Sequence, residues 1–121
     1  MSATTIQNNS RTFVAGEALD AYLLVKVGST GTVTKATAAA SEAKIGFTVS
    51  PAASGAVATI SLSHGGGTSY GIASEALDIG DKVYGDAGGK LAAAGGAGDL
   101  VGITLTAATA DGDVVEVATI Y

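Results

Sequence analysis

The chain has 121 residues, with 11 acidic and 6 basic side chains that give a formal net charge of −5, and it contains no cysteine and one histidine. Its length is that of one domain. The absence of cysteine excludes a disulfide framework, a thiol nucleophile and the common structural zinc sites. The acidic balance argues against a nucleic-acid partner, because binding phosphates requires a basic face.

The charge is unevenly distributed along the chain. Residues 1–60 carry four basic and three acidic side chains, which gives a net charge of 4 − 3 = +1. Residues 61–121 carry two basic and eight acidic side chains, which gives 2 − 8 = −6. Two interpretations stay open: an acidic surface that faces solvent, or one half that faces solvent while the other faces a partner.

The start of the chain has no targeting pattern. The first ten residues lack the basic start and the apolar run of a secretory signal. No apolar segment reaches the roughly 18 residues that a membrane span needs. We therefore expect no secretory signal and no membrane partner.

Residues 1–12 are polar and cannot nucleate a core, which predicts an extended N-terminal arm that is flexible when free. The arm is either an inert tail or a segment that orders by adding a strand to a neighbouring chain. The folded domain is expected to span residues 13–121.

An internal repeat organises the rest of the chain. The tetrapeptide Glu-Ala-Leu-Asp occurs at 17–20 and again at 75–78, and similar blocks follow both copies at an offset of 56 to 58 residues. The pattern predicts two copies of one β-rich unit, at about 13–63 and 71–121. Each copy is too small to bury a core alone, so we expect both to pack into one domain. The later matching blocks are 26–28 with 82–85, 45–48 with 101–104, and 55–60 with 112–117.

The first copy begins with a predicted hairpin. Alternating aliphatic residues indicate a strand over 23–27, which a glycine-bounded turn at 28–31 joins to a returning strand over 32–35. The alanine-rich stretch 36–42 is expected to form one helical turn capped by Thr37.

The clearest strand of the first copy spans 43–49, and its period of two places its aliphatic residues on one face. The residues expected to share that face are Ala43, Ile45, Phe47 and Val49. Alternation at Ala58, Ile60 and Leu62 predicts a further strand, and the glycines at 65–67 predict a joint between the copies.

The second copy repeats the plan, with a turn at 78–81, a strand at 82–84 and a hairpin turn at 85–89. Glycine and β-branched residues dominate, and no window has sustained helical periodicity. The predicted class is therefore all-β, a small barrel or sandwich built from two similar halves. The residues expected to share one face of the next strand are Val101, Ile103 and Leu105, and those of the last strand are Val115, Val117, Thr119 and Tyr121.

No motif indicates catalysis. His64 follows Ser61 and Ser63, but nothing places the acid that would complete a triad. The aspartates near 78–86 lie at turns and lack the spacing of a calcium loop. The glycines at 65–67 and 95–98 lack the lysine of a phosphate-binding loop. We expect no enzyme activity, no cofactor or metal, and no small-molecule substrate.

The order of the elements resembles that of the capsid decoration, or cement, proteins of tailed bacteriophages. The resemblance covers residues 10–121: a polar arm, an aliphatic strand, a glycine-rich hairpin, and the blocks Ile-Gly-Phe-Thr at 45–48 and Val-Gly-Ile-Thr at 101–104. The most specific match is the turn Leu-Asp-Ile-Gly-Asp-Lys-Val at 77–83.

Membership of this family implies a small β-barrel or β-tulip-like fold that sits as homotrimers on the outer surface of the expanded capsid and stabilises it. The implied partners are the major capsid protein and further copies of the chain. The implied location is the virion, after synthesis in the cytoplasm of the bacterial host. In such proteins the N-terminal segment, here Ser2–Thr12, often reaches onto the major capsid protein. The resulting candidate capsid contacts are Thr4, Thr5, Ile6, Gln7 and Arg11, and the candidate oligomer contacts are Phe13 and Tyr121.

The alternative function is a carbohydrate- or cell-surface-binding β module of a phage fibre or adhesin. Such modules usually expose aromatic side chains that stack on sugars, and this chain has no tryptophan. Binding to expanded empty capsids distinguishes the two functions.

Overall fold

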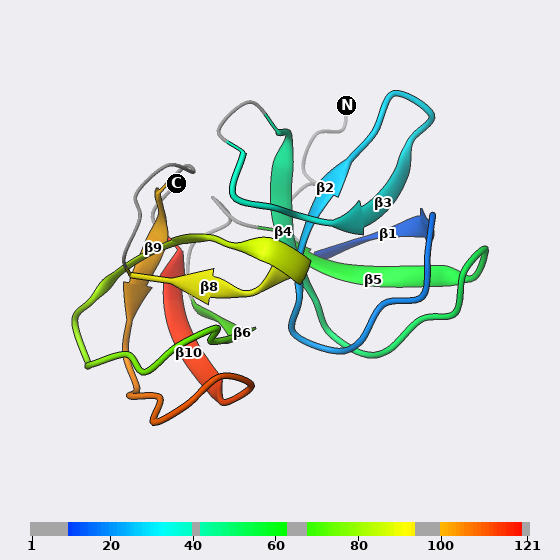
Figure 1. Ribbon diagram of the computed structural model, residues 1–121. Coiled ribbons are helices and arrows are strands. Elements are labelled where there is room, and N and C mark those ends of the chain that lie inside the picture. Colours follow the sequence, from blue (N-terminus) through cyan, green and yellow to red (C-terminus); the bar gives the residue numbers. More distant parts are fainter. Residues whose placement is uncertain (1–9, 40–41, 63–67, 94–99, 120–121) are drawn as a thin grey trace, which may run out of the picture.

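The computed structural model describes residues 10–39, 42–62, 68–93 and 100–119, and it confirms the predicted all-β class (Figure 1). Within these ranges the regular elements are strands and one short 3-10 turn, η2. Their bounds are β1 (Ser10–Ala15), β2 (Leu24–Val27), β3 (Thr32–Lys35), β4 (Lys44–Thr48), β5 (Val57–Leu62), β6 (Thr68–Ile72), β7 (Lys82–Gly85), η2 (Ala87–Gly89), β8 (Leu91–Ala92), β9 (Leu100–Thr104) and β10 (Val114–Thr119).

The first half is a closed barrel with the strand order β1-β3-β2-β4-β5, in which β5 pairs back onto β1. All of its pairings are antiparallel except β1 with β3, which run parallel. Aliphatic side chains that point inward fill the barrel, as the alternation along its strands requires. The buried residues of this first core are Ala15, Leu19, Val25, Val33, Ala58 and Ile60.

The second half pairs its strands in the same cyclic order. Its sheet runs β6-β10-β9-β7-β8, and a parallel bridge between Ala73 and Leu91 joins the end of β6 to β8. The corresponding parallel pair in the first half is Ala15 with Val33, 58 positions earlier in both strands. The chain therefore builds one strand arrangement twice.

The repeated Glu-Ala-Leu-Asp tetrapeptide performs one structural task in both halves. The carboxylate of Glu17 accepts a hydrogen bond of 2.8 Å from the backbone N–H of Lys35, and Glu75 accepts one of 2.9 Å from Ala93. The leucines Leu19 and Leu77 are both 2% exposed and form isolated β-bridges with alanines further along the chain. The tetrapeptide therefore recurs because it makes the same structural contacts in both halves.

A buried threonine fixes the aspartate end of each tetrapeptide. The hydroxyl of Thr48 donates to the carbonyl of Asp20 at 2.7 Å, and that of Thr104 donates to the carbonyl of Asp78 at 2.6 Å. Each hydroxyl also accepts a backbone N–H, from Leu23 and Asp81 respectively. Because both threonines are at most 1% exposed, these bonds satisfy polar groups that water does not reach.

The prediction that Ile45 and Phe47 share a face is wrong. The register of β2 against β4 shifts between Val25 and Lys26, whose partners are Gly46 and Lys44, so Ile45 lies in a bulge. A bulge reverses the inward–outward alternation. Ile45 therefore packs on the first core, whereas Phe47 joins the core of the second half.

The second half has the same irregularity. The partners of Val83 and Tyr84 are Gly102 and Leu100, which leaves Val101 in a bulge. Val101 is 5% exposed and belongs to the second core, while Leu105 is 42% exposed. The prediction of one face for Val101, Ile103 and Leu105 is therefore wrong for the same physical reason.

The helical turn expected in 36–42 is absent from the described part of that stretch, 36–39 with residue 42. Thr37 does not cap a helix; its N–H and hydroxyl both donate to the carboxylate of Glu42, at 2.8 and 2.7 Å. An extended loop held by one acidic side chain takes the place of the helix.

Strand β1 begins inside the segment predicted as an arm. Ser10, Arg11 and Thr12 pair with Ser61, Ile60 and Thr59 of β5. Their polar composition gave no sign of a strand, because the hydrogen bonds that pair them with β5 are made by the backbone. Residues 1–9 lie outside the described ranges, as do the glycines at 65–67 and His64.

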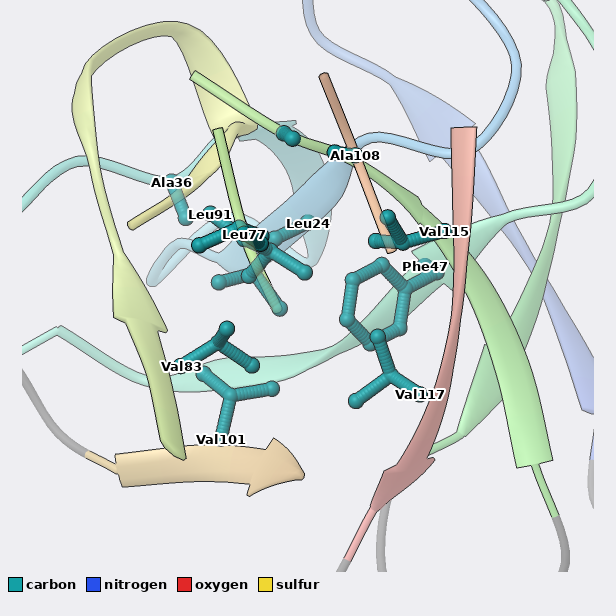
Figure 2. Close-up of a cluster of buried hydrophobic side chains, with 11 residues drawn as sticks. Leu24, Ala36, Phe47, Leu77, Val83, Leu91, Val101, Ala108, Val115 and Val117 are labelled. Atoms are coloured by element: carbon teal, nitrogen blue, oxygen red, sulfur yellow. The ribbon is translucent and has the colours of Figure 1, made fainter. Parts of the chain in front are cut away.

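The second half is filled partly by the first. Leu24 and Phe47 are each 1% exposed and belong to one cluster with eight residues of the second half and with Ala36. Figure 2 shows the Phe47 ring beside Val115 and Val117, and Leu24 next to Leu77 and Leu91. The two halves therefore share this second core, which we call the shared core.

Glycines allow this close approach. A Cβ on Gly71 would lie 2.6 Å from Leu91 Cδ1 and 3.2 Å from Phe47 Cε2. A Cβ on Gly85 would lie 2.7 Å from Lys44 Cε and 2.9 Å from the carbonyl oxygen of Thr37. Three of these distances are under 3.0 Å, which is shorter than a methyl group tolerates, so a larger residue at either position would force its neighbours to move.

Phe47→Ala is expected to destabilise the whole protein by about 3–5 kcal/mol, because it empties the centre of the shared core. Chemical denaturation followed by circular dichroism measures this loss. Val49→Ala, on the same segment but 47% exposed, is the control and should cost less than about 1 kcal/mol. Selective unfolding of the second half in the Phe47→Ala variant, with the first half unchanged, would contradict the shared core.

Candidate functional site

A hollow of about 130 Å³ opens where the two halves meet, and we call it the junction hollow. Aromatic and aliphatic side chains form part of its lining: Tyr22, Tyr70, Phe47 and Val49. Hydroxyl side chains form the rest: Thr48, Ser61, Thr68 and Ser69. The hollow thus draws residues from β4, β5, β6 and the turn before β2.

Two tyrosines, one from each half, meet at the junction hollow. The ring centroids of Tyr22 and Tyr70 are 5.6 Å apart and the ring planes are tilted by 59°. Tilted pairs at this separation are favourable for aromatic rings, by about 0.5–1.5 kcal/mol beyond their burial. The contact therefore contributes to holding the halves together.

Tyr22 adopts a strained backbone conformation to make this contact. Its φ is 65°, and it is the one non-glycine residue with positive φ among the described residues. In the second half the corresponding residue is Gly80, with φ 89°, and each donates its N–H to the equivalent threonine carbonyl, that of Thr48 or Thr104. A tyrosine where the repeat uses glycine costs about 1 kcal/mol or more, which indicates that the ring has a role.

The hydroxyl groups of the junction hollow are bonded within the protein. Ser61 and Ser69 share a hydrogen bond of 3.0 Å, and Thr68 donates to Glu116 at 2.8 Å. The exposed side chains of the hollow are Val49, Tyr70 and Thr68, and the first two are 47% and 54% exposed. Among the described residues, no charged side chain lines the hollow, and residues 45–74 contain no Asp, Glu, Lys or Arg.

Exposed aliphatic residues recur at equivalent positions of both halves. In each half a cross-strand pair, Val14 with Val57 and Ile72 with Val114, lies on the outer side of the sheet. Val49 and Leu105 continue these pairs, because their N–H groups donate to the neighbouring strands β5 and β10. Of the seven exposed large hydrophobic side chains in the described ranges, five belong to these two triplets. Contacts with another protein surface are the usual reason for such exposure.

An ionic cluster stabilises the loop beside the junction. Glu42 accepts hydrogen bonds from Lys26 Nζ at 2.8 Å and from Thr37, and its carboxylate lies 3.3 Å from Lys44 Nζ. Burial by itself raises the pKa of Glu42, but the hydrogen bonds from Lys26, Thr37 and Lys44 outweigh it and lower the pKa from 4.5 to about 2. The side chains of Glu42 and Lys44 are only 10% and 6% exposed, so this charge cluster is structural.

The site residues predicted from the sequence are not brought together at the junction hollow. Arg11 is exposed on β1, with its guanidinium carbon 4.9 Å from the ring centroid of Phe13. Phe13 is half-buried and packs on the first core, so most of its ring is unavailable to a second copy. The remaining predicted contacts, Thr4, Thr5, Ile6, Gln7 and Tyr121, lie outside the described residues.

The sequence analysis missed Tyr22 and Tyr70. One signal was available, because the repeat aligns Tyr22 with Gly80, and a turn position that accepts glycine in one copy and tyrosine in the other is unusual. The distance between the two rings depends on how the halves pack, which no local pattern encodes.

The described residues show no arrangement for metal chemistry or membrane insertion. Within them, no group of three or more His, Cys, Asp or Glu side chains converges to hold a metal ion. The same ranges contain no helix with the length and apolar character required to cross a membrane.

No protein-family model matches the chain, and its comparison with curated proteins gives no match. Among solved structures, the chain is similar to the N base of head fiber gp8.5 in bacteriophage phi29. The TM-score is 0.70 and the sequence identity is 17%, and the alignment covers 92% of this chain and 92% of that chain. At this identity the likeness establishes a shared fold that extends over both halves.

Glu42→Gln is expected to reduce stability at pH 7 by about 2–3 kcal/mol. The pKa of Glu42 is lower in the folded state, about 2, than in the unfolded chain, so the ionised carboxylate stabilises the fold above pH 4.5 and this contribution is lost as the pH falls toward 2. Urea unfolding across this pH range measures it.

The matched control is Asp111→Asn. Asp111 forms an ion pair with Lys90 at 2.7 Å, but its side chain is 62% exposed, so the change should cost at most about 1 kcal/mol. A Glu42→Gln penalty that stays constant between pH 2 and pH 7 would show that the charge of Glu42 does not stabilise the loop.

A double-mutant cycle of Tyr22→Gly and Tyr70→Ala is expected to give a coupling free energy of about 0.5–1.5 kcal/mol, because the two rings are in contact. Thermal unfolding of the two single variants, the double variant and the parent protein supplies the four values. Additive effects would mean that the strained Tyr22 is not retained for its contact with Tyr70.

Proposed function

We propose that this protein is a structural component of a tailed-bacteriophage head, a decoration or cement protein that binds the outside of the expanded capsid as a homotrimer and stabilises it. The observation that carries the proposal is the fold match over 92% of both chains to the base of a phage head fiber. The resemblance of residues 10–121 to decoration proteins supports it independently.

The distribution of exposed apolar side chains supports a binding role. Two aliphatic triplets face outward at equivalent positions, and the junction hollow adds Tyr70 between the halves. A protein that binds only the assembled shell adds its binding free energy to the stability of that shell, by linkage. Modest contacts of this kind, repeated over many copies, then stabilise a large particle.

The same residues speak against an enzyme. The hydroxyls of the junction hollow are bonded to one another, to Glu116 or to the carbonyl of Asp20, and among the described residues no base or acid lines the hollow to activate them. The partners in this proposal are the major capsid protein and further copies of the chain. Nucleic acid, membranes and small-molecule substrates are not partners.

The second candidate function is a carbohydrate-binding module of a phage fibre or adhesin. The observation that favours it is the pair Tyr22 and Tyr70 at a hollow lined with hydroxyl groups. The 59° tilt and the 5.6 Å separation point the rings at each other, however, whereas a sugar stacks on an open ring face. A glycan array separates this function from capsid binding.

The arm is tested by removing residues 1–9, a deletion that stops before the ladder pairs of β1 begin at Ser10. We expect the truncated protein to keep its fold and to bind expanded, undecorated heads at least about tenfold more weakly, which corresponds to 1.4 kcal/mol. Co-sedimentation with heads measures binding, and circular dichroism checks the fold.

The full-length chain is the control in the same experiment. Equal binding by both proteins would overturn the role of the arm while leaving the cement function intact. Absence of binding by the full-length chain would overturn the cement function itself.

A further inference from the structure

We infer that the junction hollow binds the N-terminal segment of its own chain, residues 1–9, with the side chain of Ile6 as the anchor. The inference concerns the isolated chain and does not rest on the proposed function. Four observations support it: the position of Ser10 beside the hollow, the length of residues 1–9, the lining of the hollow, and the contact of the strained Tyr22 with Tyr70.

The segment leaves the folded part directly beside the hollow. Ser10, the first residue of β1, is the Cα partner of Ser61, and Ser61 lines the junction hollow. Partners across an antiparallel pair lie about 5 Å apart. Ser10, to which residues 1–9 are joined, therefore lies next to the rim of the hollow.

The reach of the segment fits the anchor. Four peptide units separate Ser10 from Ile6, and an extended chain of that length spans at most about 14 Å. The hollow is lined by Ser61 itself and by Val49, whose N–H donates to the neighbouring β5 residue Thr59. Ile6 is thus within reach of the hollow without any change in β1.

The chemistry of the segment matches that of the hollow. Residues 1–9 contain no charged side chain, and Ile6 is their one branched aliphatic residue. The hollow has no charged lining and exposes Val49 and Tyr70 by 47% and 54%. Covering these two side chains removes apolar surface from water. The open hollow, of about 130 Å³, has room for a single side chain.

Tyr22 adds an aromatic side chain to the lining of the hollow, whereas the equivalent residue of the second half, Gly80, has no side chain. At the equivalent turn of the second half, Gly80 leaves no side chain, and nothing lies within 4 Å of the position of its missing Cβ. Tyr22 accepts positive φ at the same place and holds its ring against Tyr70. Binding of Ile6 against this ring explains why the first half keeps a strained aromatic residue there.

Anchoring Ile6 has a consequence for recognition. It fixes the position of the residues on either side, including Thr4, Thr5 and Gln7, so that a partner which binds them loses less conformational freedom on association. The hollow would then preorganise the arm for whatever surface the arm recognises.

The absence of cysteine makes a direct test simple, because two introduced cysteines have no competitors. In the full-length chain, the I6C/V49C pair should form an intramolecular disulfide under mild oxidation at low protein concentration. Intact mass and thiol titration measure its rate. A disulfide requires Cα atoms within about 7 Å, so its rate reports how often Ile6 occupies the hollow.

The matched control is I6C/T12C. Thr12 is exposed on β1 and is closer to Ile6 in sequence than Val49 is, so a freely moving segment closes this shorter loop at least as fast. We expect the I6C/V49C disulfide to form about tenfold faster than I6C/T12C, because binding in the hollow raises the local concentration at Val49 alone.

Equal or faster closure of I6C/T12C would overturn the inference, and so would a product of twice the chain mass from I6C/V49C. A second measurement avoids cysteine altogether. The methyl resonances of Val49 should shift between the parent protein and Ile6→Asp, while those of Leu105, its equivalent in the second half, should not. Unchanged Val49 resonances would also overturn it.

Discussion

The insertion of Leu24 and Phe47 into the second half is the contact on which the rest of the structure depends. Two halves of this size are small for independent folding, and among the described residues the second sheet closes through a single parallel bridge, Ala73 with Leu91. The side chains that complete its interior come from the first half. This arrangement fixes the relative position of the two sheets, and with it the distance between Tyr22 and Tyr70 and the shape of the junction hollow.

The sequence predicts the fold class and much of the first hairpin, because these depend on local signals. The turn at 28–31 and the strand over 32–35 are confirmed by β3 and by the positive φ of Gly31. The opposite orientations of Ile45 and Phe47 were not predictable from alternation, since the bulge that separates them arises from the register of β2 against β4. The start of β1 was missed for a related reason: Ser10, Arg11 and Thr12 are held by backbone pairing, which polar composition does not reveal.

The candidate site was less predictable than the fold. Glu-Ala-Leu-Asp, the most conspicuous repeat of the sequence, makes the same backbone hydrogen bonds and β-bridges in each half, which are structural contacts. The functional signal lies instead where the halves differ. Tyr22 replaces the glycine that the second half has at position 80, and Tyr70 stands where the first half has Thr12. Both differences converge on the junction hollow, beside the point where the N-terminal segment leaves the fold. The residues that the two halves share are therefore structural, whereas Tyr22 and Tyr70, at which the halves differ, are the candidates for recognition.

The most direct test of the proposed role on a phage head is cryo-electron microscopy of mature particles of the phage that is proposed to encode this chain. The account predicts density for this fold, a closed barrel packed on a second five-stranded sheet, on the outer capsid surface, in groups of three, with the N-terminal segment directed at the major capsid protein. Density for this fold at the tail or in tail fibres, or its absence from the virion, would contradict the account. In that case the tyrosine pair at the junction hollow would become the first place to look for a ligand.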